Sequence, residues 1–300
     1  MRRPFLLFSI GTEYEKESQI LSGIVMTAVL FAALLHASWN AVIKSGKSKV
    51  LDIALVVCGA GLIAAATLFF LPLPATGSGP YLVVSAVIQL AYFAVIAAVY
   101  RTGELSYVYP IMRGSAPLLT ALVAGVFVGE RLASGAWAGI VFISAGILLL
   151  ATNQWRSDRF DLAQTLLALG NAALICVYTV VDGIGTRLSG NAFSYVGWMM
   201  ALDGIAMAVF VLARYREESM REFPLRWTIG LGGGFCAWAS YGIALWAMTR
   251  APVAMVAALR ETSVIFAIIL ATVVLKEKFS NTRYAAAFLV CTGAVSLKVL

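Results

Sequence analysis

The sequence predicts an all-α, polytopic membrane protein with ten transmembrane helices. Of its 300 residues, 61% are hydrophobic and 12% are charged, and the mean hydropathy is +0.89, whereas about a quarter of the residues in soluble domains are charged. The hydrophobic residues also fall into ten stretches of about 20, the length that crosses a hydrocarbon core about 30 Å thick. The connections between these stretches are short, which leaves no room for a soluble catalytic domain.

The ten stretches are predicted to be helices because they lack the alternation of apolar and polar residues that barrel strands show. They cover residues 20–44, 52–72, 80–100, 105–128, 133–152, 162–182, 193–213, 227–249, 252–275 and 281–299. Pro110, Pro117 and Pro252 are expected to break or kink the fourth and ninth helices. Residues 1–20 are expected to form an N-terminal tail, to which no function is assigned.

An internal repeat divides the chain. With an offset of 147, residues 112–131 align with residues 259–278, so that Arg113 coincides with Arg260 and Glu130 with Glu277. The sequence therefore predicts two five-helix units, residues 21–153 and 160–300. Because five is odd, the second unit must enter the membrane in the opposite sense, as in the inverted repeats of many secondary transporters.

Arg113 and Arg260 are each expected about eight residues inside a span, close to the middle of the membrane. A charge at that depth costs about 2.5–3.5 kcal/mol on insertion scales, so it normally faces water or a partner. One interpretation is that the two guanidinium groups bind the acidic group of a substrate, since arginine binds carboxylates and phosphates through two parallel hydrogen bonds. The alternative is structural: Glu261 or Asp203 neutralises an arginine and the pair locks helices together.

Several short motifs carry a resemblance to a known family. LLHASWNAVIKS at residues 34–45, the VGER and LKEK endings of the fourth and ninth spans, and the order of the ten spans resemble the EamA family of the drug/metabolite transporter superfamily. The resemblance implies transport of small metabolites, among them amino acids, drugs, nucleotide sugars and phosphorylated sugars, and many members are exporters. In related organic-phosphate exchangers, basic residues of the fourth and ninth helices hold the anionic substrate, and the resemblance implies the same role for the matching residues Arg113 and Arg260.

Further candidate residues line the same predicted site. His36, Trp39 and Asn40 share one face of the first helix because they are spaced i, i+3 and i+4, although His36 could equally be a packing residue with a hydrogen bond. Tyr92, Trp238 and Tyr241 either contact the substrate or belong to the aromatic belt at the membrane interface.

Coupling, metals and cofactors are constrained by the titratable residues. His36, Asp203 and Glu261 are the candidates for coupling transport to protons. A single histidine and four cysteines without a CxxC motif predict no metal site, and no cofactor is expected. The phosphate-binding motif GxxxxGK[ST] is absent from the sequence, so an ion or solute gradient is expected to drive transport.

The sequence as a whole predicts a secondary transporter, an exporter or exchanger, of small organic metabolites such as amino acids or organic anions. It would alternate access at a midplane site between the two repeats. The alternatives are a membrane-embedded enzyme acting on lipid head groups and a passive channel for anionic metabolites.

The setting of the protein is expected to be a bacterial inner (plasma) membrane. Its expected partners are the metabolite and the surrounding lipid, with no nucleic acid, since the net charge of +7 comes from the loops. A monomer or weak homodimer is expected. The Lys and Arg residues are concentrated after odd-numbered spans, which predicts both termini outside, whereas the family resemblance predicts both inside.

Overall fold

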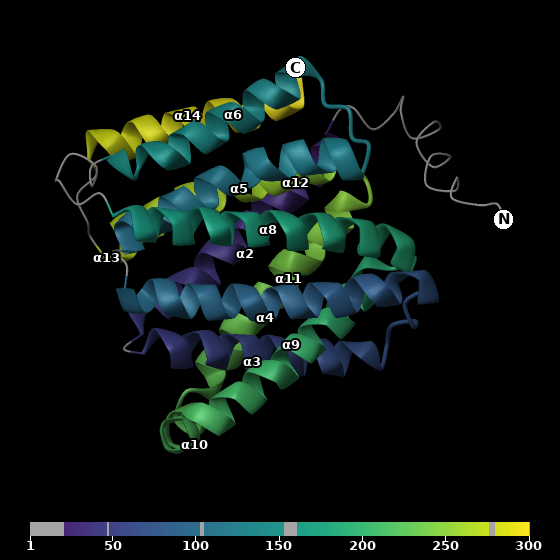
Figure 1. Ribbon diagram of the computed structural model, residues 1–300, viewed down its shortest axis with the longest axis vertical. Coiled ribbons are helices and arrows are strands. Elements are labelled where there is room, and N and C mark those ends of the chain that lie inside the picture. The colour runs from purple at the N-terminus through teal and green to yellow at the C-terminus, as the bar shows by residue number, and fades with distance from the viewer. Residues whose placement is uncertain (1–20, 47, 103–104, 153–160, 276–279, 300) are drawn as a thin grey trace.

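The computed structural model describes residues 21–46, 48–102, 105–152, 161–275 and 280–299 (Figure 1). The predicted tail 1–20 and Glu277 lie outside the described residues. The helices are α2 (Gly23–Ser45), α3 (Lys49–Leu68), η1 (Thr76–Ser78), α4 (Gly79–Thr102), α5 (Leu105–Phe127), α6 (Ser134–Leu149), α8 (Leu162–Ser189), α9 (Ala192–Arg214), α10 (Arg216–Leu225), α11 (Trp227–Met248), α12 (Val253–Arg260), α13 (Ser263–Leu275) and α14 (Asn281–Val299).

The prediction of an all-helical membrane protein is confirmed, but the expected count of ten spans is not reached in the described residues. Eight stretches there are long and apolar enough to cross a membrane, and one of them, Val253–Leu270, joins α12 to α13. The other two expected spans correspond to α6 and α14. With 16 residues, α6 is about 24 Å long, shorter than a hydrocarbon core. The inverted repeat and its boundaries stay a prediction.

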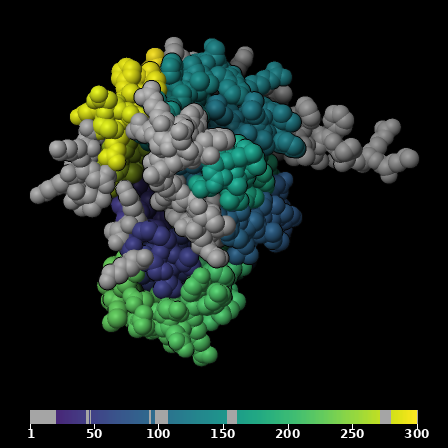
Figure 2. All heavy atoms as spheres, turned by 60° about the vertical axis from the view of Figure 1, so that its left-hand side comes forward, coloured from purple at the N-terminus to yellow at the C-terminus, as the bar shows by residue number. Residues whose placement is uncertain are grey.

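The helices form a stack in which neighbours in space are often distant in sequence. Helices α6 and α14 pack together at one end, while α3, α9 and α10 lie at the other (Figure 1). Figure 2 shows the same arrangement from the side, with the yellow C-terminal residues against the teal residues of the first half. Between these ends, α11 packs on α2 and α3, and α8 packs on α4 and α5. These central helices surround the cavity described below.

Side-chain caps define where several helices begin. Ser22 accepts a hydrogen bond from the backbone N–H of Val25 at the start of α2, and Asp161 accepts from Ala163 at the start of α8. Asn191 does the same for α9, directly after Gly190, whose φ of 75° ends α8. Such residues satisfy backbone N–H groups that the first helical turn leaves without partners.

The helix breaks differ from those expected at the prolines. Helix α5 runs through Pro110 and Pro117 without a break, since each proline removes only one helical hydrogen bond and neighbouring helices can hold the rest. Pro252 marks the start of α12. The interruption lies after Arg260, where the N–H of Glu261 and Thr262 bond to carbonyls three residues back. This tight turn separates α12 from α13.

Helices approach closely where glycines face each other. A Cβ atom on Gly234 of α11 would lie 2.4 Å from the backbone nitrogen of Ala60 on α3, and 2.5 Å from the carbonyl carbon of Gly59. The pairs Gly61–Gly204, between α3 and α9, and Gly139–Gly293, between α6 and α14, are also close: a Cβ on either glycine of a pair would lie between 2.6 and 2.8 Å from the backbone of the other. Small residues in such positions let membrane helices gain van der Waals contact along their backbones.

Glu130, which follows α5, holds the start of α12. Its carboxylate accepts hydrogen bonds from the backbone N–H groups of Val253 (2.7 Å) and Ala254 (3.2 Å). It also forms an ion pair with Arg187 of α8 at 3.0 Å, and Arg187 in turn donates to the carbonyl of Met248. Glu130 is therefore a helix cap between segments far apart in sequence.

We expect Gly234→Ala to destabilise the protein, because the added methyl group collides with the backbone of α3. Unlike a flexible side chain, that backbone can give way only if the whole helix shifts. The matched control is Gly232→Ala, two residues earlier in the same helix, where a Cβ meets nothing within 4 Å and where alanine favours the helix by about 0.5–1 kcal/mol. Thermal denaturation followed by size-exclusion chromatography in detergent should give a lower midpoint for Gly234→Ala alone. Equal midpoints would contradict the close approach of α3 and α11.

We expect Glu130→Ala to lower the melting midpoint by roughly 2–8 °C, because losing a helix cap costs about 1–2 kcal/mol and leaves Arg187 without its carboxylate. Arg131→Ala, at the exposed neighbouring residue, is the control and should leave the midpoint unchanged. If the two variants melt alike, Glu130 does not cap α12 in the folded protein.

Candidate functional site

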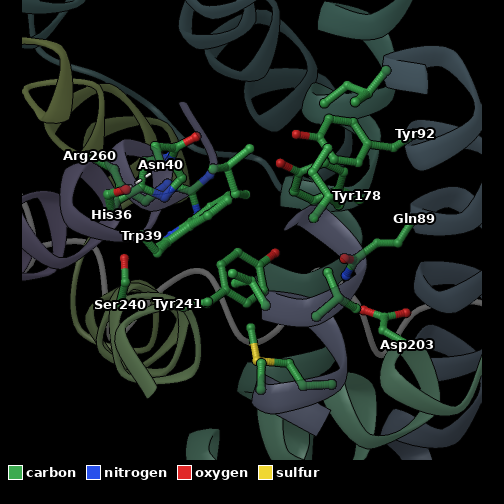
Figure 3. Close-up of a pocket in the computed structure, with 18 of the residues that line it drawn as sticks. His36, Trp39, Asn40, Gln89, Tyr92, Tyr178, Asp203, Ser240, Tyr241 and Arg260 are labelled. Carbon is green, nitrogen blue, oxygen red and sulfur yellow. Dashed lines mark hydrogen bonds between the residues drawn. The ribbon is translucent and has the colours of Figure 1, made fainter. Parts of the chain in front are cut away.

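A cavity of about 140 Å³ lies among the central helices α2, α3, α4, α5, α8, α9, α11 and α12 (Figure 3). A water molecule needs about 10–15 Å³ by this measure, so the cavity has room for roughly ten waters or for a small metabolite. Both buried arginines face it. Its wall is otherwise composed mainly of aliphatic and aromatic side chains, with a few polar groups at defined places.

Arg113 of α5 is neutralised by a carboxylate. Its Nε lies 2.8 Å from Glu261 Oε2, and both side chains are almost fully buried. The N–H is not aligned for a hydrogen bond, so the contact is an ion pair. A terminal nitrogen of the same guanidinium lies 3.2 Å from His36 Nε2 of α2. Glu261 occupies the turn between α12 and α13, and that interruption of the helix accordingly lies beside Arg113.

Arg260, the last residue of α12, has no such counter-ion. Arg260 is 4% exposed, and no carboxylate of the described residues lies within ion-pair distance of its guanidinium group. The guanidinium carbon lies 5.3 Å from the centre of the Tyr241 ring, within the range of a cation–π contact. Its Nε has no hydrogen-bond partner in the described part of the chain. The two arginines that the predicted repeat pairs therefore differ: Arg113 has a carboxylate beside it, whereas Arg260 has none among the described residues.

The carboxylate of Asp182 on α8 fixes the position of the Tyr241 side chain by accepting a hydrogen bond from its hydroxyl. The Tyr241 hydroxyl donates to Asp182 Oδ2 at 2.5 Å, and Tyr195 of α9 donates to Oδ1 at 3.0 Å. Asp182 is not among the site residues predicted from the sequence, because the predicted sixth span ends at that residue, whereas α8 continues to Ser189. The signal that could have identified Asp182 is a carboxylate within the otherwise uncharged run VYTVVDGIG.

Aromatic rings form one side of the cavity. Tyr92 of α4 and Tyr178 of α8 meet edge to face with ring centres 5.8 Å apart, and Tyr178 lies 6.5 Å from Tyr241. Trp39 packs against His36 on α2 at 5.0 Å. Tyr178 was also not selected from the sequence, since nothing distinguished it from other tyrosines in the spans.

Most of the predicted site residues come together at this cavity. Its wall includes His36, Trp39, Asn40, Tyr92, Arg113, Asp203, Tyr241 and Arg260. The amide nitrogen of Asn40 donates to the carbonyl of His36 in its own helix.

Two of the predicted site residues do not line the cavity. Glu261 lies in contact with Arg113 rather than on the wall. Trp238 packs between Phe193 and Phe235, because the face of α11 that meets the cavity carries Ala237, Ser240 and Tyr241, and Trp238 is turned about 100° away from Ala237.

Asp203 of α9 lies on the opposite side of the cavity from Arg260 (Figure 3). It is 5% exposed, and its Oδ1 has no hydrogen-bond partner among the described residues. Gln89 of α4 lies beside it, and its amide nitrogen donates to Ser85 Oγ and Met199 Sδ. This side of the cavity therefore presents hydrogen-bond acceptors, whereas the Arg260 side presents donors.

Metal-binding groups do not gather anywhere in the described residues: no three His, Cys, Asp or Glu side chains there could share an ion. Cys58, Cys176, Cys236 and Cys291 are free thiols.

Comparisons with known proteins agree with the fold. Residues 163–298 match the model of the EamA-like transporter family. A solved crystal structure superimposes with a TM-score of 0.72 over 92% of this chain and 98% of the other, at 18% sequence identity, a likeness of fold alone. No curated protein matches the sequence. Residues 163–298 are thus similar to the EamA-like transporter family, and the eight stretches of the described residues that are long and apolar enough to cross a membrane are those of a multi-pass integral membrane protein.

Proposed function

We propose that the protein is a secondary transporter, an exporter or exchanger, for a small organic metabolite with an acidic group, and that this group binds to Arg260. The observation that carries the proposal is the buried guanidinium of Arg260 at the wall of the cavity, which has no carboxylate within ion-pair distance and no hydrogen-bond partner for Nε among the described residues. Amino acids and organic anions both have the required acidic group.

The energetic argument starts from the cost of a buried charge. An arginine at mid-depth in a membrane costs about 2.5–3.5 kcal/mol on insertion scales unless water or a counter-charge compensates it. The carboxylate of a bound solute could accept from Nε and a terminal nitrogen of Arg260 in parallel, the arrangement that guanidinium groups favour. Tyr241 supports this geometry, since its ring holds one face of the guanidinium.

Arg113 has a different part in the proposal. Its charge is already compensated by Glu261, so it contributes less to the attraction of an anion and more to the position of the turn between α12 and α13. Both interpretations of the arginines from the sequence then apply, one to each residue.

Transport itself would follow by alternating access between two inverted halves. Discontinuous helices beside a midplane cavity are typical of secondary transporters, and the turn after Arg260 is such an interruption. His36 and Asp203 at the wall, and Glu261 at Arg113, remain the candidates for proton coupling. An ion or solute gradient would supply the energy.

The proposal predicts opposite outcomes for the two arginines. Arg260→Gln should weaken binding of an acidic substrate by roughly 10- to 100-fold, because a hydrogen bond to a charged group contributes about 1.5–3 kcal/mol. The measurement is counterflow in proteoliposomes with radiolabelled amino acids, organic acids and phosphorylated metabolites. A folded Arg260→Gln protein that transports like the wild type would exclude Arg260 as the anchor.

The matched control concerns Arg113. Arg113→Gln alone should destabilise the protein by about 3–5 kcal/mol, because Glu261 would stay buried without its partner. The double variant Arg113→Gln/Glu261→Gln removes both charges and should recover folding and most of the substrate affinity. Counterflow also separates a transporter from a channel, since a channel does not accumulate labelled solute against unlabelled solute.

A further inference from the structure

We infer that the solute is bipolar and extended: a linear amino acid whose ammonium group is several methylene groups away from its carboxylate. This rests on the proposed function, since it takes Arg260 as the anchor of the carboxylate. The new element is Asp203, which would receive the ammonium group at the other side of the cavity.

Asp203 meets the requirements for such a contact. It is 5% exposed, faces the cavity, and leaves Oδ1 without a hydrogen-bond partner in the part of the chain that the structure describes. No Lys, Arg or His of that part forms an ion pair with it. A carboxylate in this situation is costly, and an ammonium group in the cavity would both compensate its charge and donate to Oδ1.

Gln89 makes this side of the cavity more suitable for a cation. Its amide nitrogen is engaged with Ser85 and Met199, so the amide offers its oxygen, an acceptor, to a solute. An ammonium group has three donors and no acceptor. Asp203 and Gln89 can together accept two of its hydrogen bonds, whereas a second carboxylate or a phosphate would be repelled here.

The two charged groups are too far apart to compensate each other. Figure 3 shows Arg260 and Asp203 on opposite sides of the cavity, with Tyr241 between them, and no ion pair joins them. An α-amino acid with an uncharged side chain carries both its ammonium and its carboxylate group on the same α-carbon and could satisfy one side only. A solute with separated charges satisfies both sides at once.

The middle of the cavity suits a chain of methylene groups. Tyr92, Tyr178 and Tyr241 form a continuous row of ring contacts there, and aliphatic side chains of α3 complete the wall, Ile53, Val56 and Val57 among them. This surface rewards apolar contact and offers no further charge. The volume of about 140 Å³ fits a solute with on the order of ten heavy atoms.

The test uses four ligands with the same number of carbon atoms: 5-aminopentanoate, 2-aminopentanoate, pentanoate and pentylamine. Binding to the purified full-length protein in detergent is measured by isothermal titration calorimetry at constant pH and salt. We expect 5-aminopentanoate to bind about tenfold or more tightly than each of the others, because only it meets both charged sides. Labelled 5-aminopentanoate should also show counterflow in proteoliposomes without an ion gradient.

Variants assign each preference to one residue. Asp203→Asn, which keeps the shape of the side chain, should abolish the preference for 5-aminopentanoate over pentanoate. Arg260→Gln should abolish the preference over pentylamine. Arg131→Gln, at an exposed residue that does not line the cavity, is the control and should keep both preferences. Monodisperse size-exclusion profiles establish that each variant is folded.

The contrary outcomes are distinct. If 2-aminopentanoate or pentanoate binds as tightly as 5-aminopentanoate, the bipolar inference is wrong and the proposed acidic substrate stands. If Asp203→Asn keeps the wild-type preference and loses only proton-driven accumulation, Asp203 serves coupling and the inference is again wrong. If no ligand with a carboxylate binds to the folded wild type, both the inference and the proposed function fail.

Discussion

The ion pair between Arg113 and Glu261 is the constraint on which the centre of this structure depends. A guanidinium in an apolar interior must be compensated, and the compensating carboxylate lies in the turn between α12 and α13 rather than on a regular helix. The ion pair therefore joins α5 to the point at which the ninth predicted span is interrupted. His36 contacts the same guanidinium from α2, so three separate helical segments converge on one charge.

With Arg113 compensated in this way, Arg260 and Asp203 are the cavity charges that we propose bind a solute. Arg260 lies one residue before Glu261 and faces the cavity rather than the ion pair. Its position is supported by Tyr241, whose hydroxyl is in turn fixed by Asp182. At its other end, α12 begins on the carboxylate of Glu130. Helix α12, of eight residues, is thus capped at its start by Glu130 and followed at its end by Glu261, which pairs with Arg113. Both contacts fix the position of Arg260, the residue proposed to bind the solute.

Several parts of the site were predictable from the sequence because they depend on local or repeated patterns. The offset of 147 residues paired Arg113 with Arg260, and the spacing of His36, Trp39 and Asn40 placed them on one face; all five line the cavity. Other parts were not. Asp182 lay at the end of a predicted span, and nothing in the sequence distinguished Tyr178 from other tyrosines in the spans. Trp238 and Tyr241 lie on the same helix, and the packing of α11 decides that Tyr241 faces the cavity and Trp238 does not.

The sequence by itself determined the all-helical membrane class and the presence of two buried arginines, because hydrophobic length and the cost of intramembrane charge are properties of the chain alone. Only the tertiary structure decided which arginine is compensated. Glu261 directly follows Arg260 in sequence, yet it pairs with Arg113, since the turn after α12 directs its side chain toward α5. Contacts between distant segments depend on how the helices pack against one another, and that packing cannot be derived from the spacing of residues along the sequence.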